Sequence, residues 1–331
     1  MKKFMIGVLA AAMIMGAGTT TAFAGTDTAI TSTTLTEGDF EYVAYDKYVE
    51  ITRFSISSSV TDVVVPSRID GLPVTKIGAQ AFIERPRIES ITLPEGIESI
   101  GEEAFALCSN LKTIKLPSTL KDIGNLAFVR CNMLTDINLP DSLLTIGDDS
   151  FAGCRSLRSV SIPDSVYDIG KSAFSNCIEL EKITFPKGLR YVVDEEVCKG
   201  CTSLKEVNIQ NGPGLIGSNA FIDCKSLEKI YIPISITGLS QNAENPFVGC
   251  TSLTDVYYAG TENQWEAIDE KLQLSLTSTV VHFNTKRAAS SLSPDVNSDG
   301  SIDASDASFI LAYYAYTMTG GKGTIDEFMK K

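Results

Sequence analysis

The chain has 331 residues, and its 41 acidic side chains outnumber its 28 basic ones, which gives a formal net charge of −13 at pH 7. A surface this acidic argues against nucleic-acid binding, which needs a basic patch to neutralise phosphates. The single histidine, His282, also excludes most Ser-His and Cys-His mechanisms.

Residues 1–24 have the pattern of a secretory signal peptide. Lys2 and Lys3 precede an apolar run from Phe4 to Ala17, and Ala22-Phe23-Ala24 is a small-x-small cleavage signal. The run is shorter than the roughly 18 residues expected of a membrane anchor. No later segment is apolar enough to span a bilayer, so we expect a secreted, extracellular protein that starts at Gly25.

Residues 25–59 are expected to start the mature chain and to cap a repeat array that begins near residue 60. Thr26 to Thr36 is rich in Thr and Ala, which predicts a disordered start. Phe40 to Ile56 alternates apolar and polar residues, which predicts an antiparallel hairpin.

A pattern with a period of 23 residues recurs about eight times over residues 60–260. One copy, Ile100 to Asp122, reads IGEEAFALCSNLKTIKLPSTLKD, and further copies begin at Ile123, Ile146 and Ile169. One column is Phe82, Phe105, Phe128, Phe151, Phe174, Cys198, Phe221 and Phe247, and another is Cys108, Cys131, Cys154, Cys177, Cys201, Cys224 and Cys250. Self-similarity at a fixed period predicts a stacked solenoid.

Each copy is expected to contribute one strand. Ile114 faces the core and Lys115 faces solvent, because successive side chains of a strand point to opposite faces. Pro117 ends the strand, since it has no N–H to donate. Gly124 then turns the chain, where its freedom to take positive φ would be used, and Phe128 points inward.

The frame I-G-x-x-A-F-x-x-C-x-x-L-x-x-I-x-L-P resembles the BspA-like leucine-rich repeats of bacterial surface and secreted proteins, over roughly residues 60–258. The resemblance implies a β-rich, parallel β-solenoid with an extended ligand-facing sheet. It also implies a role in adhesion or protein binding.

The cysteine column is expected to consist of free, buried thiols. The column stacks one repeat above the last with parallel Cβ vectors, whereas a disulfide needs a dihedral near 90°. The C-x-x-C of Cys198 and Cys201 is explained by the repeat frame. With one histidine and no second C-x-x-C, a zinc or redox site is not expected.

Exposed strand positions near the end of the array carry tyrosines. Tyr231 and Tyr257, with Tyr258 beside them, are candidates for contact with a protein or carbohydrate. Packing against the end cap is the alternative explanation.

Residues 261–284 are expected to form a C-terminal cap. A short helix over Asn263 to Glu270 would plug the core with Trp265, and Ser278 to Phe283 would add a last strand. Residues 285–294 have the polar composition of a linker.

Residues 295–331 are expected to form a separate module, which begins with DVNSDGSIDASD. Oxygen ligands for calcium fall at positions 1, 3, 5, 7, 9 and 12 of an EF-hand loop, as Asp295, Asn297, Asp299, Ser301, Asp303 and Asp306. Gly300 at position 6 permits the sharp turn, and Asp rather than Glu stands at position 12.

That departure, with ASDASFILAYYAY behind it, resembles the type I dockerin repeat. Dockerins tether secreted proteins to cohesin modules on scaffold proteins of cellulosome-like complexes, which degrade polysaccharides. By this resemblance, the tail would be a small α-helical module whose Ala304 and Ser305 contact a cohesin. A full dockerin has two such loops, and residues 320–331 supply no second one.

The motifs together favour a non-enzymatic, secreted binding protein that is tethered through a calcium-dependent dockerin to a scaffold. The alternative is a cell-surface or host-directed adhesin whose tail only binds calcium. A third hypothesis, a carbohydrate-active enzyme, would need a carboxylate pair in a cleft, which regular repeats do not provide in any obvious place.

Overall fold

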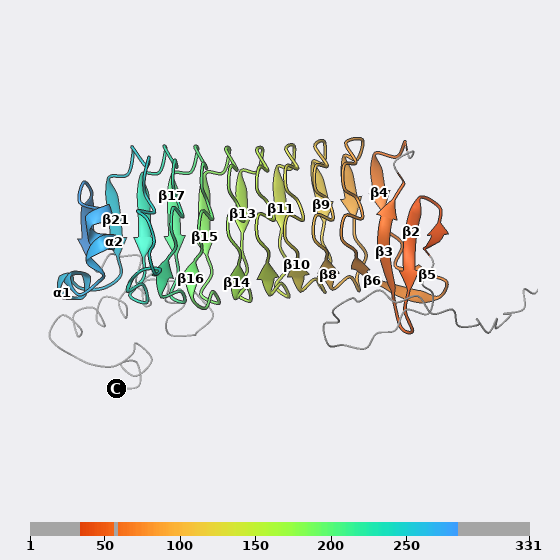
Figure 1. Cartoon of the computed structure of the whole chain (residues 1–331), viewed down its shortest axis with the longest axis horizontal. Helices are drawn as coiled ribbons and strands as arrows, with labels where there is room; N and C mark the ends of the chain where they lie inside the picture. The colour runs from red at the N-terminus through yellow and green to blue at the C-terminus, as the bar shows by residue number, and fades with distance from the viewer. Residues whose placement is uncertain (1–33, 56–58, 284–331) are drawn as a thin grey trace, which may run out of the picture.

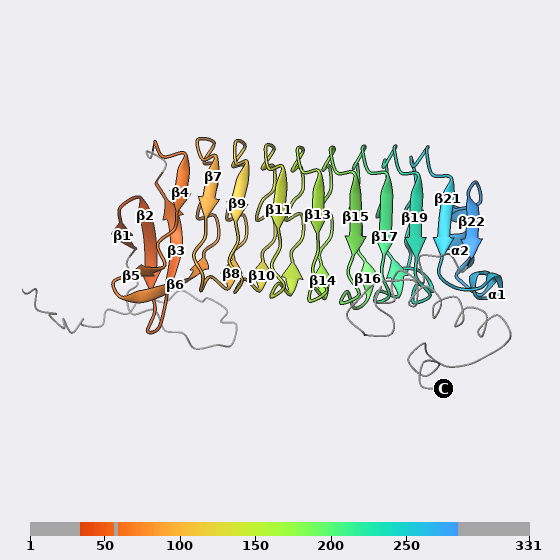
Figure 2. The same ribbon diagram turned by 180° about the vertical axis from the view of Figure 1, so that it is seen from behind.

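The computed structural model describes residues 34–55 and 59–283, which form an elongated parallel β-solenoid (Figure 1). A hairpin covers one end and two short helices lie at the other (Figures 1 and 2). The predicted signal peptide, the predicted linker and the predicted calcium loop lie outside the described residues. No helix in the described ranges is long and apolar enough to cross a membrane.

Two columns of parallel strands build the solenoid. The first column consists of β4 (Asp62–Val64), β7 (Ser90–Thr92), β9 (Thr113–Lys115), β11 (Asp136–Asn138), β13 (Ser159–Ser161), β15 (Lys182–Phe185), β17 (Glu206–Ile209), β19 (Lys229–Ile232), β21 (Asp255–Tyr258) and β22 (Val280–Phe283). The second consists of β6 (Leu72–Ile77), β8 (Ser99–Ile100), β10 (Asp122–Ile123), β12 (Thr145–Ile146), β14 (Asp168–Ile169), β16 (Val192–Val193), β18 (Leu215–Ile216) and β20 (Gly238–Leu239).

The first column gives the solenoid about ten turns. Its strands form a three-stranded sheet, β4 to β9, and a seven-stranded sheet, β11 to β22. The predicted count of about eight repeats was therefore too low. The additional turns are formed at the two ends, where β4 and β22 pair in the same register although their sequences depart from the consensus frame.

The predicted inward and outward faces are confirmed. Ile114 is 7% exposed, whereas Thr113 and Lys115 on the same strand are exposed. Phe105, Phe128, Phe151 and Phe174 are fully buried, and consecutive rings stack with centroids 5.1–5.4 Å apart. This spacing is close to the distance of about 4.8 Å between neighbouring strands, so each ring lies on its counterpart in the previous turn.

The glycine that follows each isoleucine of the second strand column was predicted to turn the chain with positive φ, and this prediction was wrong. Gly101, Gly124 and Gly147 do not have positive φ. A Cβ at Gly147 would lie 2.6 Å from the backbone N of Asn125 in the previous turn, and one at Gly101 would lie 2.6 Å from the backbone N of Ala79. These glycines are required because successive turns approach too closely for any side chain.

Positive φ falls two residues after each glycine of this column, on residues that have side chains. Glu103, Leu126, Asp149 and Ser172 have φ between 50° and 57°. The left-handed conformation costs roughly 1–2 kcal/mol for an L-residue. The packing of the Phe column that follows each of these residues must offset that cost.

The close approach of turns is tested by Gly147→Ala. We expect a loss of about 1–3 kcal/mol in the free energy of unfolding, because the added methyl overlaps the backbone of the previous turn. Gly153→Ala is the matched control: its Cβ would meet nothing closer than 3.4 Å, and only its φ of 73° opposes the change. Denaturant unfolding followed by circular dichroism measures both losses, and a smaller loss at Gly147 than at Gly153 would contradict the interpretation.

The N-terminal cap is a three-stranded antiparallel unit of β1 (Leu35–Glu37), β2 (Phe40–Ala44) and β3 (Val49–Phe54). The predicted hairpin is thus confirmed. Leu35 and Thr36 belong to β1, so the expected disordered start does not extend to Thr36; their backbone groups pair with β2.

The cap makes the same contacts with the first turn as each turn makes with the next. The N–H of Phe54 donates to Ala81 O, as that of Phe82 does to Ala104 O, and the Phe54 ring stacks 5.3 Å from Phe82. Arg85 stands where later turns have cysteine, and its Nε donates to Phe54 O at 2.9 Å. β3 then pairs in parallel with β6, and the short β5 (Arg68–Ile69) pairs with β6 through a turn at residues 70–71.

The C-terminal cap has two helices, α1 (Glu262–Glu266) and α2 (Glu270–Ser275), in place of the single predicted helix. The break occurs because the Asp269 side chain accepts from Lys271 N and begins a second helix. Trp265 is 8% exposed and lies 5.2 Å from the Tyr258 ring, which confirms the predicted plug. The predicted last strand is confirmed as β22.

Candidate binding surface

The outer face of the first strand column changes in its side-chain chemistry along its length. Its centre carries short polar side chains, such as Asn138, Ser161 and Thr184. Towards the C-terminal end the same position is occupied by Tyr231, Tyr257 and His282, which the parallel register places side by side. We call these three residues the aromatic ladder.

The rings of the aromatic ladder stack on one another. The Tyr231 and Tyr257 centroids are 4.6 Å apart with 14° between the ring planes, and Tyr257 and His282 are 4.6 Å apart with 15°. All three side chains are half-buried. Because the rings cover each other's faces, the ladder presents mainly ring edges to a ligand.

A column of charged residues, Lys182, Glu206, Lys229 and Asp255, runs along the same face, and of these Lys229 and Asp255 lie beside the aromatic ladder. Lys182 Nζ lies 3.1 Å from Glu206 Oε1, and His282 Nε2 lies 2.6 Å from Asp255 Oδ1. The hydrogen bond from His282, and then the one from Thr254, lower the pKa of Asp255. The Asp255 carboxylate therefore stays charged at neutral pH and holds the His282 ring in the stack.

The predicted tyrosines are brought together in part. Tyr231 and Tyr257 lie on the outer face, where a ligand could reach them. Tyr257 also packs against His282 of the cap strand, so exposure on the face and packing against the cap are both present. Tyr258 is 2% exposed and points inward, because neighbouring residues of a strand alternate between faces. His282 was missed, although its place in the predicted last strand could have aligned it with Tyr257.

A comparison with known protein families matches residues 75–195 and 191–275 to the BspA-type leucine-rich repeat region, in six copies. The chain belongs to this family. Among solved structures, it is 34% identical to the leucine-rich repeat protein of T. pallidum, with a TM-score of 0.54 over 59% of this chain and 91% of that one. No curated protein matches the chain.

Two other solved structures have lower sequence identity to this BspA-type chain. A leucine-rich cell surface protein of Faecalibacterium prausnitzii is 20% identical, with a TM-score of 0.36 over 72% of this chain and 98% of that one. The pneumococcal vaccine antigen PcpA is 16% identical, with a TM-score of 0.35 over 76% of this chain and 99% of that one.

The cysteines of the BspA-type repeats are free thiols, as predicted. Each thiol of the column donates to a backbone carbonyl of the previous turn, with Sγ to O distances of 3.0–3.3 Å. Cys131, for example, donates to Phe105 O. Cys198 itself is fully buried in a Phe position, and its carbonyl accepts from Cys224. The column therefore links successive turns.

Burial disfavours the charged thiolate form of these cysteines. It raises the pKa of Cys108 to about 11 and that of Cys250 to about 12, and it raises the pKa of Cys131, Cys154 and Cys177 well above the ordinary value. Within residues 34–55 and 59–283, no group of His, Cys, Asp or Glu side chains could hold a metal ion.

Thiol labelling tests the column. We expect slow labelling of the native protein at pH 8, because thiolate is the reactive form and burial raises the pKa of these thiols. Cys250 should react first, because it is half-buried and the reagent reaches it more easily than the buried thiols of the column. The native rate should rise with pH above 8 as the least buried thiols ionise. After denaturation about eight thiols should react, and bridged pairs found by mass spectrometry would contradict the prediction.

The predicted calcium ligands, Asp295 to Asp306, and the predicted cohesin contacts, Ala304 and Ser305, lie outside the described residues. They stay predictions from the sequence.

Proposed function

We propose that this BspA-type protein is a secreted, non-enzymatic binding protein whose outer sheet face contacts a protein or carbohydrate ligand at the aromatic ladder. The observation that carries the proposal is the stack of Tyr231, Tyr257 and His282, which lies half-buried at the C-terminal end of the first strand column.

The physical basis is preorganisation. Tyrosine and tryptophan dominate binding hot spots because they offer a large amphipathic surface at a small cost in side-chain entropy. In the ladder that cost is reduced further, since each ring is already held by its neighbour at 4.6 Å. Lys229 and Asp255, which lie two residues before Tyr231 and Tyr257 on β19 and β21, would supply charged partners for a ligand's polar groups.

The binding role is tested by screening the mature chain on glycan and protein arrays and measuring the hits by calorimetry. Tyr257→Ala should weaken a genuine hit about tenfold, the loss expected for a hot spot worth about 1.4 kcal/mol. Thr113→Ala, an exposed change on the same face far from the ladder, is the matched control and should leave affinity unchanged. Hits that tolerate Tyr257→Ala, or no hits on either array, would contradict the assignment.

For the tail we propose a calcium site and a tether. Asp295, Asn297, Asp299, Asp303 and Asp306 would give side-chain oxygens, and Ser301 its backbone carbonyl, to one Ca²⁺ ion. Without the cation, the carboxylates gathered at one point would repel each other, so binding and ordering of the loop are coupled. Through Ala304 and Ser305, the loaded module would dock on a cohesin of an extracellular scaffold.

Calorimetry of the mature chain separates the two claims about the tail. Ca²⁺ should bind with measurable heat, and Asp295→Ala combined with Asp306→Ala should abolish that heat while the solenoid keeps its circular dichroism spectrum. A panel of cohesins should bind only when Ca²⁺ is present. Heat with Ca²⁺ but with no cohesin would refute the tether, and absence of both would refute the metal site as well.

The alternative role is a cell-surface or host-directed adhesin whose tail only binds calcium. The sequence of residues 320–331 favours it, because this stretch supplies no D-x-N-x-D loop where a full dockerin would carry its second one. Calcium binding without cohesin binding is the result that this alternative predicts.

A further inference from the structure

The N-terminal cap covers only one of the two strand columns. β3 pairs with β6 and so continues the second column. β4, the first strand of the first column, pairs with β7 on one side, and no described strand pairs with its other edge. Among residues 34–55 and 59–283, a place for one more strand is thus left open between the cap and the first turn.

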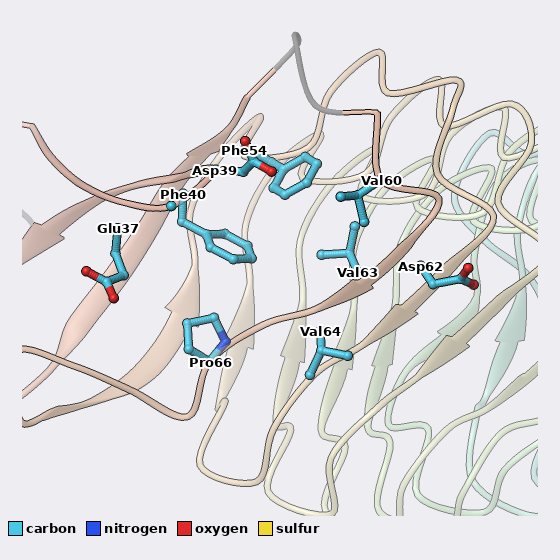
Figure 3. A pocket seen from close by; sticks show the side chains of 10 residues that line it. Glu37, Asp39, Phe40, Phe54, Val60, Asp62, Val63, Val64 and Pro66 are labelled. Carbon is cyan, nitrogen blue, oxygen red and sulfur yellow. The ribbon is translucent and has the colours of Figure 1, made fainter.

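A groove of about 300 Å³ occupies this place (Figure 3). Phe40 and Phe54 of the cap and Val63 of β4 are among the side chains that line it. Phe54 is the last stacked ring of the column that runs through the solenoid, so the aromatic column ends at this groove. Val64, also on the lining, is 69% exposed.

Three acidic residues are among those that line the groove, and the carboxylates of Glu37 and Asp62 point outward from its two sides (Figure 3). Glu37 and Asp39 of the cap and Asp62 of β4 are part of the lining, which includes no lysine or arginine. Asp62 accepts hydrogen bonds from Ser90 Oγ at 2.6 Å and from Thr61 Oγ1 at 3.0 Å. These bonds lower the pKa of Asp62, so this carboxylate is negative at neutral pH.

We propose that the groove binds an extended basic segment of a partner protein, which adds to the open edge of β4 as a further parallel strand. An edge strand offers unpaired backbone groups that an extended peptide satisfies, and a side chain of every second residue can enter a pocket beside it. An aliphatic side chain would contact Phe54 and Val63, and lysine or arginine side chains would pair with Glu37 and Asp62.

Charge selects this occupant over the chain's own N-terminal segment. Residues 25–33, GTDTAITST, contain Asp27 and no lysine or arginine, so they bring a further negative charge to a negative site. Electrostatic complementarity of the kind proposed steers association and suppresses partners of the same sign.

The first experiment titrates a labelled seven-residue peptide of alternating lysine and valine into the mature protein and follows fluorescence anisotropy. We expect saturable binding that weakens as salt is raised, because exposed charges are screened. The same peptide with glutamate in place of lysine should not bind. The basic peptide with N-methyl groups on alternate amides, in either register, should bind at least about tenfold more weakly in the register that removes the donors facing β4.

Protein variants locate the site. Glu37→Gln combined with Asp62→Asn removes two groove charges and keeps the hydrogen-bonding shape, and it should weaken the basic peptide at least about tenfold. Asp46→Asn combined with Asp141→Asn removes two exposed charges elsewhere and should leave binding unchanged. Circular dichroism confirms that both variants are folded.

Three results would overturn the proposal. They are no saturable binding of the basic peptide, equal weakening by the two double variants, and full binding of both N-methylated peptides. Sedimentation of the protein alone tests a second copy as the occupant: self-association that the groove variant abolishes would replace the partner segment with this chain.

Discussion

The parallel register between successive turns is the constraint on which the rest of the structure depends. Strands stack at about 4.8 Å, so each residue of a repeat lies directly on its counterpart in the previous turn. A ring therefore meets a ring, as Phe128 meets Phe151 at 5.1 Å. The same constraint leaves no room for a Cβ at Gly147, because the backbone of the previous turn lies at the position the methyl would take.

The register also explains why the repeats tolerate substitutions in the core columns. Cys198 replaces a phenylalanine, yet its backbone carbonyl still accepts a thiol hydrogen bond from the next turn. Arg85 replaces the first cysteine, and its guanidinium reaches the corresponding carbonyl of Phe54 in the cap. In both places the acceptor is a backbone carbonyl, so the residue that carries the carbonyl can change, as at Cys198, and so can the side chain that donates to it, as at Arg85.

Both surfaces proposed for binding arise where the repetition ends. The aromatic ladder needs β22, whose His282 completes the stack although it belongs to the cap. The groove beside β4 exists because the N-terminal cap continues one strand column and not the other. The central turns, where short polar side chains face solvent, provide a regular support between these two ends.

The sequence by itself determined the solenoid, its buried columns, the free thiols and two of the three ladder residues, because each of these follows from a period that local residues repeat. Only the tertiary structure decided the number of turns, the close approach at the glycines, the inward orientation of Tyr258 and the contribution of His282. It also decided that the cap leaves β4 open. These features depend on which strands meet across turns of irregular length, and the caps that set those pairings do not repeat the consensus.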